Sequence, residues 1–140
     1  MDCIYPDQRD YYLYIAMRKI NDPELMATLT IMADHIGKDH PILIEDLAVL
    51  VYGDKRYERQ SRDDLLILRD EYHIPIGSNS GQAGRWIIVD GDDLHHTANE
   101  IESRGYKLIN LARKMRTMNL RPKLTPEAQV ELETNQGRLW

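Results

Sequence analysis

Residues 77–84 and several carboxylate pairs contain the residue types that enzymes use, but their spacing does not match a catalytic site. Residues 77–81 have the outline of a nucleophile elbow, yet Asn79 stands where the serine would be. The glycines between 77 and 84 are not followed by Lys-Ser or Lys-Thr, so they do not form a P-loop motif. The pairs Asp63-Asp64 and Asp92-Asp93 suit surface turns and helix starts, where Asp92 is a candidate cap. The sequence therefore predicts a protein that is not an enzyme.

The histidines and the cysteine do not have metal-ligand spacing. No two histidines form the i, i+4 pair that a zinc site on a helix would use, and the adjacent pair points in different directions. A single cysteine, Cys3, excludes a zinc finger. We predict no metal and no cofactor. The five histidines are His35, His40, His73, His95 and His96.

Charge is unevenly distributed along the chain, whose net charge is −5. This acidic balance argues against a protein that coats nucleic acid without specificity, although a specific binder depends on local charge instead. Seven basic residues and no acidic one lie between Ser103 and Pro126, whereas residues 90–102 hold five acidic residues and no Lys or Arg. The lone cysteine, the absence of a secretory signal and the absence of a long apolar run predict a cytoplasmic protein with no membrane partner.

Hydrophobic spacing and turn residues predict an α+β, mainly α, protein. Asp22-Pro23 starts a helix that continues through Ile36 to a stop at Gly37. A later helix has Tyr57, Ser61, Leu65, Leu68 and Tyr72 on one face. The predicted elements are helices at 11–20, 23–36, 44–52, 56–72, 90–118 and 126–133, strands at 42–43, 74–76 and 86–89, and a flexible turn at 77–84. Residues 11–20 fit either a helix or a strand, and the helix is favoured.

The same pattern divides the chain into four regions. These are a tyrosine-rich N-terminal extension (1–22), a domain of three helices and a β-hairpin (23–90), a long helix (91–118) and a flexible C-terminal tail (119–140). The long helix has a heptad-like seam suited to close approach of another helix, which favours a homodimer. Folding back onto the preceding domain, or docking of another protein, is the alternative. The seam residues are Leu94, Ala98, Ile101, Gly105, Leu108, Ala112 and Met115.

The order helix, short strand, helix, turn, helix and hairpin resembles a winged helix-turn-helix. The passage from Leu68 to Ser78, with its Leu-Arg, Pro-Ile and Ser residues, is similar to the wing region of biotin-repressor-type regulators. It is still more similar to small winged-helix proteins of bacteriophages and prophages. The resemblance covers about residues 24–118 and implies double-stranded DNA binding, in transcription regulation or replication initiation, in a bacterial host cell.

The resemblance also implies which residues meet DNA. The helix predicted at 56–72 would enter the major groove with its N-terminal residues against base edges. The wing would contact phosphate or the minor groove. Lys55 is a candidate phosphate contact. The helix residues are Arg56, Arg59, Gln60, Ser61 and Arg62, and the wing residues are Ser78, Asn79, Ser80, Gln82 and Arg85.

A different interpretation of the same helix remains open. Five basic and six acidic residues lie between Gly53 and Tyr72, which is typical of a solvated helix with ion pairs such as Arg59–Asp63. A non-catalytic adaptor that binds a replication or transcription protein would use such a face, for example in replisome assembly. The basic stretch from Arg104 to Lys123 likewise suits either a phosphate-binding extension or the polar side of a dimer helix.

Overall fold

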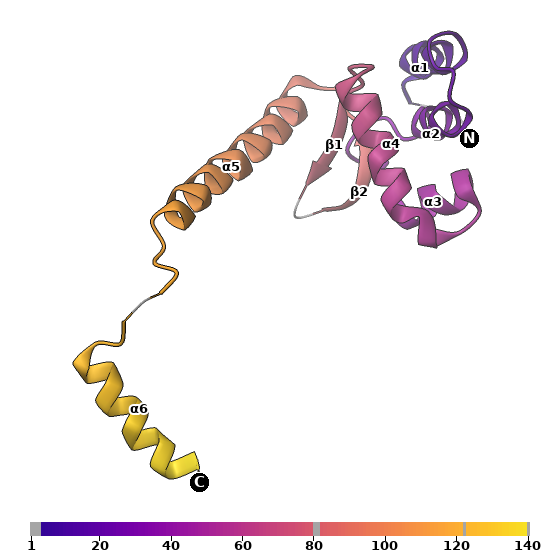
Figure 1. The fold of residues 1–140 in the computed structure, drawn as a ribbon. Coiled ribbons are helices and arrows are strands. Elements are labelled where there is room, and N and C mark those ends of the chain that lie inside the picture. The colour runs from indigo at the N-terminus through magenta and orange to yellow at the C-terminus, as the bar shows by residue number, and fades with distance from the viewer. Residues whose placement is uncertain (1–3, 80–81, 122, 140) are drawn as a thin grey trace. The chain divides into compact units, whose positions relative to one another are not determined.

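The computed structural model describes residues 4–79, 82–121 and 123–139. Figure 1 shows a mainly helical chain with one small antiparallel sheet of two strands. Residue contacts divide the chain into two compact units, 1–103 and 104–140, and the boundary falls within one continuous helix, α5. The elements are α1 (Pro6–Arg18), α2 (Pro23–Met32), α3 (Ile44–Tyr52), the 3-10 turn η1 (Lys55–Tyr57), α4 (Glu58–Asp70), β1 (Ile76–Asn79), β2 (Gln82–Ile87), α5 (Gly91–Arg116) and α6 (Pro126–Leu139).

Helix α1 belongs to the core of the first unit. Its N-terminal proline occupies the first helical position, and its inner face packs against α2. Ala16 and Ile20 are almost fully buried in the same apolar cluster as Leu29 and Leu65. The prediction of a helix here is confirmed, but its bounds of 11–20 were wrong, because α1 begins at Pro6 and ends at Arg18. The region assigned to an N-terminal extension contributes side chains to this core.

Helix α2 begins as the sequence predicts and ends earlier. The Asp22 carboxylate accepts hydrogen bonds from the amides of Glu24 and Leu25 at 2.9 and 3.1 Å. The Leu25 hydrogen bond above all holds the pKa of Asp22 below its ordinary value. The prediction that this helix extends to Ile36 is wrong, because Ile36 forms a bridge with Ile87 of β2.

Backbone pairing with β2 explains the early end of α2. The Ile87 amide donates to the carbonyl of His35, and the Gly37 amide donates to the carbonyl of Ile87, both at 2.8 Å. These groups are unavailable for helical bonds. Gly37 has a φ of +97°, which glycine adopts at little cost and which turns the chain toward Pro41.

Ile42 pairs with the sheet, and α3 follows at once. Ile42 and Arg85 exchange both backbone hydrogen bonds, at 2.8 and 2.9 Å. The predicted strand at 42–43 is therefore wrong in its extent, because only an isolated bridge at Ile42 forms. Leu43 is instead the N-cap of α3. Helix α3 buries Ile44, Leu47 and Ala48, and it ends at Gly53 as predicted.

Helix α4 places its apolar residues against α2 and α3. Ser61, Leu65 and Leu68 are buried, whereas Tyr57 precedes the helix and is 41% exposed. The predicted bounds of 56–72 were too wide because residues 55–57 form the separate turn η1 and the helix stops at Asp70. Ile74 then donates its amide to the carbonyl of Leu68 and directs the chain into the hairpin.

The β-hairpin is longer than the sequence predicts. Ile76 pairs with Ile87, Gly77 with Trp86 and Asn79 with Gln82, with an irregularity between Gly77 and Asn79. Much of the predicted turn at 77–84 is therefore strand, and the return strand begins at Gln82 instead of Trp86. The sequence predicted a hairpin that is too short, because only its apolar residues alternate as in a strand. The polar residues at the end of the hairpin have weak strand propensity.

Helices α5 and α6 are each capped at the N-terminus by a side-chain oxygen. Asp90 accepts a hydrogen bond from the Asp93 amide at 2.8 Å, so Asp90 caps α5 and the predicted cap at Asp92 is wrong. Thr125 caps α6 through the Ala128 amide, and α6 extends beyond the predicted 126–133. Within the described residues, we find no helix with the length and apolar character that crossing a membrane requires.

Gly77 provides a direct test of the hairpin. A Cβ atom at this position would lie 2.5 Å from Nε1 of Trp86, whose side chain is fully buried. Gly77→Ala is therefore expected to lower the free energy of unfolding by about 1–3 kcal/mol, the usual cost of overpacking. Chemical denaturation followed by circular dichroism measures this. Gly91→Ala is the control, because its Cβ would meet nothing within 4 Å, and an equal loss in both variants would contradict this packing.

Candidate nucleic-acid interface

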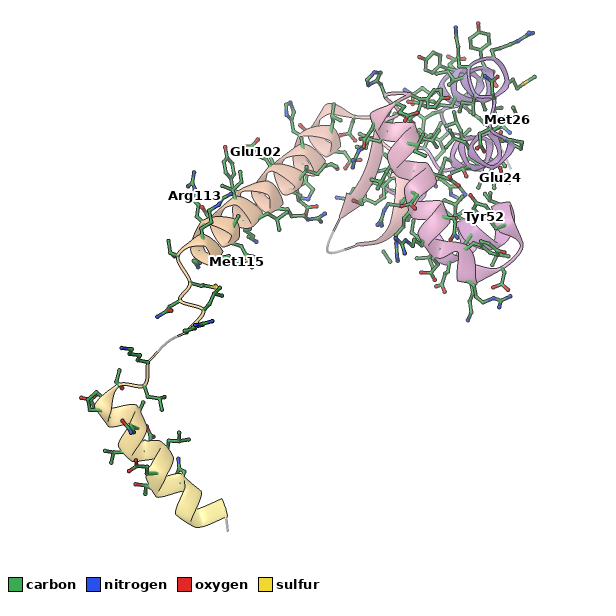
Figure 2. The ribbon with its side chains drawn as sticks, in the orientation of Figure 1. Glu24, Met26, Tyr52, Glu102, Arg113 and Met115 are labelled. Atoms are coloured by element: carbon green, nitrogen blue, oxygen red, sulfur yellow. The ribbon has the colours of Figure 1, made fainter. Side chains whose placement is uncertain are left out.

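The N-terminal half of α4 is held against α3 by Tyr52. Its hydroxyl donates to Oδ2 of Asp64 at 2.5 Å, and its ring stacks on Tyr57 with centroids 5.2 Å apart. Figure 2 shows Tyr52 extending from α3 within this group of helices. Burial and this hydrogen bond raise the pKa of Tyr52 well above its ordinary value, so Tyr52 remains a donor at neutral pH. The contacts fix the position of the turn η1 and the first turns of α4.

Five of the predicted DNA contacts lie on an exposed surface. Lys55, Arg56, Arg59 and Arg62 are exposed, as is the neutral Gln60 beside them. We call these five residues the α4 surface. They come from one short stretch of chain, so η1 and α4 alone bring them together.

Ion pairs restrain two of these arginines. Arg56 Nε lies 3.0 Å from Asp54 Oδ2, and Arg62 Nη2 lies 3.4 Å from Glu58 Oε2. The predicted pair Arg59–Asp63 does not form among the described residues. The i, i+4 ion pair that does form on α4 is Glu58–Arg62. Both observed pairs are exposed, and such pairs typically contribute about 0–1 kcal/mol, so a phosphate can displace either carboxylate at little cost.

Ser61 does not belong to the α4 surface. Its side chain is fully buried on the face of α4 that carries Leu65 and Leu68, and its hydroxyl has no hydrogen-bond partner among the described residues. Its predicted role as a DNA contact is therefore wrong. Helical spacing correctly predicted that Ser61 lies on the apolar face of α4. A side chain on that face cannot reach solvent or DNA.

The structure describes only some of the side chains that were predicted as DNA contacts in the hairpin. Ser78 is half-buried in β1. Arg85 is half-buried, its backbone is paired with Ile42, and its Nη1 donates to the carbonyl of Gly84 at 3.1 Å. Asn79 and Gln82 pair at the end of the hairpin, but their side chains lie outside the described residues, as does the whole of Ser80. In Figure 1, the N-terminal end of α4 and the Asn79/Gln82 end of the hairpin point toward the same side of the first unit.

A buried hydrogen bond connects the hairpin to the start of α5. Trp86 Nε1 donates to Oδ2 of Asp93 at 2.7 Å, and Asp93 is only 8% exposed. The sequence pattern predicts Asp93 to lie at the surface, and this prediction is wrong. Trp86 is the signal that could have identified Asp93 as buried. A buried indole N–H needs an acceptor, and the first acidic residues after β2 are close to Trp86 in sequence.

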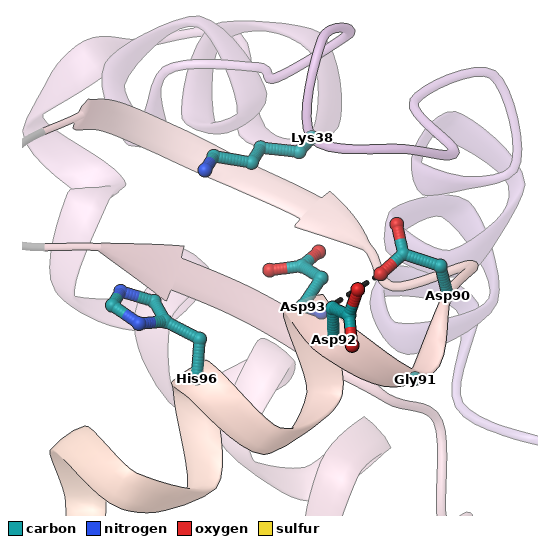
Figure 3. Close-up of a pocket in the computed structure, with 6 residues that line it drawn as sticks. All are labelled: Lys38, Asp90, Gly91, Asp92, Asp93 and His96. Carbon is teal, nitrogen blue, oxygen red and sulfur yellow. Dashed lines mark hydrogen bonds between the residues drawn. The ribbon is translucent and has the colours of Figure 1, made fainter.

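A hollow of about 580 Å³ lies beside this hydrogen bond. Figure 3 shows Asp90, Asp92 and Asp93 at its edge, with Lys38 and His96 on other sides. Three carboxylates around one lysine would repel phosphate, so the hollow is no part of a nucleic-acid surface. Among residues 4–79, 82–121 and 123–139, no group of three His, Cys, Asp or Glu side chains is arranged to hold a metal ion.

The predicted seam of α5 is accessible along its length. Leu94, Ile101, Leu108 and Met115 are between 49% and 66% exposed. Ala98 is also exposed, and Gly105 and Ala112 are half-buried. Among the described residues of the first unit, the apolar core includes none of Leu94, Ala98 and Ile101.

Comparisons with known proteins found no match to this chain, either among family models, among curated proteins or among solved structures.

The buried hydroxyl of Ser61 leads to a prediction about stability. An unpaired polar group inside a protein costs its lost hydration, so Ser61→Ala is expected to raise the free energy of unfolding by about 1 kcal/mol. Urea denaturation measures the change. Gln60→Ala, at the neighbouring exposed position, is the control and should leave stability within the error of the measurement. A clear loss of stability in Ser61→Ala would show that the hydroxyl has a partner after all.

Asp64 leads to a prediction about pH. Burial raises the pKa of its carboxyl above the ordinary value of 3.8, and the nearby Asp22 and Glu24 carboxylates raise it further. A raised pKa favours the folded state at low pH, and this contribution is lost as pH rises from 3.8 through the folded-state value. Asp64→Asn stays neutral and still accepts from Tyr52, so its stability relative to wild type should increase from pH 4 to pH 7.

Unfolding experiments across this pH range test the effect of Asp64. Asp63→Asn removes the same charge from an exposed position one residue away on α4 and serves as the matched control. If both variants gave the same pH dependence, the burial of Asp64 would not be its cause.

Proposed function

We propose that this chain is a winged-helix protein that binds double-stranded DNA in the cytoplasm as a homodimer. Its role would be transcription regulation or replication initiation for a bacteriophage or other mobile element, as the resemblance of residues 24–118 implies. The observation that carries the proposal is the α4 surface, where three arginines, a lysine and a glutamine are exposed on the turn η1 and the first turns of α4. Arg and Gln are the side chains that most often form paired hydrogen bonds with guanine and adenine.

The surroundings of the α4 surface support the same proposal. Helix α4 is preceded by α3 and a short turn and is followed directly by a two-stranded hairpin. The hairpin is fixed to the body of the unit, because β2 exchanges backbone hydrogen bonds with Ile42. A rigid hairpin beside an exposed helix is suited to contact two parts of a duplex together.

Arg59 has the leading role within this surface. It is exposed and, unlike Arg56 and Arg62, has no acidic partner among the described residues. It can therefore approach a base edge or phosphate without first leaving an ion pair. Arg56 and Arg62 would exchange their carboxylates for phosphate oxygens, which makes their contribution more sensitive to salt.

A second function, a non-catalytic adaptor for a replication or transcription protein, is favoured by a different observation. Exposed apolar side chains lie on α3 and α4, where Leu50 is 62% and Leu66 is 45% exposed. Asp63 and Asp70 share the exposed side of α4 with the arginines. Such mixed surfaces are common at transient protein interfaces.

The test is DNA binding by fluorescence anisotropy at two salt concentrations, using fragments of the surrounding genome. Wild-type protein is expected to bind one fragment in preference to the others and to weaken steeply as salt increases. The double variant Arg59→Ala/Arg62→Ala should lose about 1–3 kcal/mol for each base contact removed, and its salt dependence should become less steep for each phosphate contact removed.

A charge-matched variant controls for net charge. Arg18→Ala/Arg69→Ala removes two exposed arginines, from α1 and from the C-terminal end of α4, and should bind like wild type. Equal weakening of the two double variants would contradict a role for the α4 surface in particular. No binding of wild type to any fragment at low salt would favour the adaptor.

A further inference from the structure

Large apolar side chains form a stripe along α5. Leu94, Ile101, Leu108 and Met115 recur at every seventh position and are 49%, 49%, 66% and 60% exposed. A seven-residue repeat keeps side chains on one face of a helix and is typical of helices that pack against another helix. Single exposed apolar residues are normal on a protein surface, but contiguous ones mark contact surfaces. Four large apolar residues aligned on one face of α5 therefore indicate a contact surface.

Small residues alternate with the large ones. Ala98, Gly105 and Ala112 also recur at every seventh position, between the positions of the stripe. Glycine weakens a helix interior, and a Cβ atom at Gly105 would meet nothing within 4 Å. The chain's own fold therefore does not require glycine here. Close approach of another helix backbone would require it.

The charges of α5 are divided between its two halves. Residues 91–103 contain four acidic residues and no Lys or Arg, and residues 104–116 contain five basic residues and no acidic one. The helix dipole favours this polarity only within the first and last turns. It does not explain why the change of sign falls between Glu102 and Arg104, near the middle of the helix. A partner helix with the opposite order of charges would complement both halves.

We propose that the partner of this α5 face is α5 of a second copy of the chain, packed antiparallel. This arrangement places the acidic half of each helix beside the basic half of the other. A parallel pair would instead place acidic beside acidic and basic beside basic, which is destabilising. The inference deepens the proposed homodimer but does not depend on DNA binding.

The spacing of large and small residues restricts the antiparallel register to two alternatives that differ by seven residues. In the first register, Leu108 lies opposite Gly105 of the second copy, Ile101 lies opposite Ala112 and Met115 lies opposite Ala98.

In the second register, Leu108 lies opposite Ala98, Ile101 lies opposite Gly105 and Leu94 lies opposite Ala112. In either register three large side chains face small ones, which lets the two backbones approach closely while the side chains interdigitate. The two-fold symmetry repeats each of these pairs.

Arg113 and Met115 extend from opposite sides of α5 in Figure 2, so this cation stands away from the apolar stripe. The charge complementarity is therefore a property of the two halves of the helix as a whole. It would determine the orientation of the pair more than its affinity.

Cysteine cross-linking of the full-length chain tests the orientation. In a Cys3→Ser background, Ala98→Cys is expressed alone, together with Met115→Cys, and together with Leu108→Cys. Each sample is then oxidised and separated without reductant. An antiparallel pair predicts a covalent dimer in one of the two mixtures and none for Ala98→Cys alone, because a disulfide requires Cα atoms within about 7 Å. Cross-linking of Ala98→Cys alone would indicate a parallel pair and overturn the proposal, as would no cross-linking in either mixture.

Sedimentation of three substituted chains tests the surface. Gly105→Leu fills the space needed by the second backbone, and Leu108→Glu places a charge in the seam. Each is expected to raise the dimer dissociation constant at least tenfold while circular dichroism shows an unchanged helix content. Tyr106→Glu, at a 60% exposed position off the seam, is the matched control. A monomeric wild type would refute both this inference and the proposed homodimer, whereas a dimer unaffected by Gly105→Leu and Leu108→Glu would refute only the inference.

Discussion

The buried indole of Trp86 is the contact on which the first unit depends. Its ring covers Gly77 of the opposite strand so closely that no side chain fits there, and its N–H group donates to Asp93 at 2.7 Å. One side chain therefore fixes the register of the hairpin and the starting point of α5. Because a buried carboxylate without a donor is costly, the two residues keep each other in place. The direction in which α5 leaves the sheet follows from this pair and from the Asp90 cap.

Local sequence signals predicted most of the helices. Asp22-Pro23 started α2, Gly53 ended α3, and heptad spacing predicted α5 to within about two residues at each end. Such signals act within one turn of helix, so they can be recognised without knowing the tertiary contacts. The mainly α character with a small antiparallel sheet followed from the same signals.

The main errors in the bounds of the elements have a different cause, which is contact between parts of the chain that are distant in sequence. Ile36 fits a helical pattern, but its backbone pairs with Ile87, fifty-one positions later (87 − 36). The hairpin was predicted too short because Gly77 has no strand propensity, and its place in β1 depends on Trp86. Within the candidate interface, the exposed arginines lay where helical position predicted. Ser61 was misplaced because its polar character was given more weight than its position on the buried face.

The pairing of β2 with residues 36 and 42 also has a consequence for the order of folding. The ribosome completes α1 to α4 before it adds the strand that satisfies the backbone groups of His35, Gly37 and Ile42. Until then these groups must bind water, and the apolar side chains of α2 and α4 lack the cover that Ile87 provides. The helices can form early because their contacts are local, but the unit closes only when a loop of about fifty residues has been brought together. A nascent chain that stops before β2 therefore exposes its core.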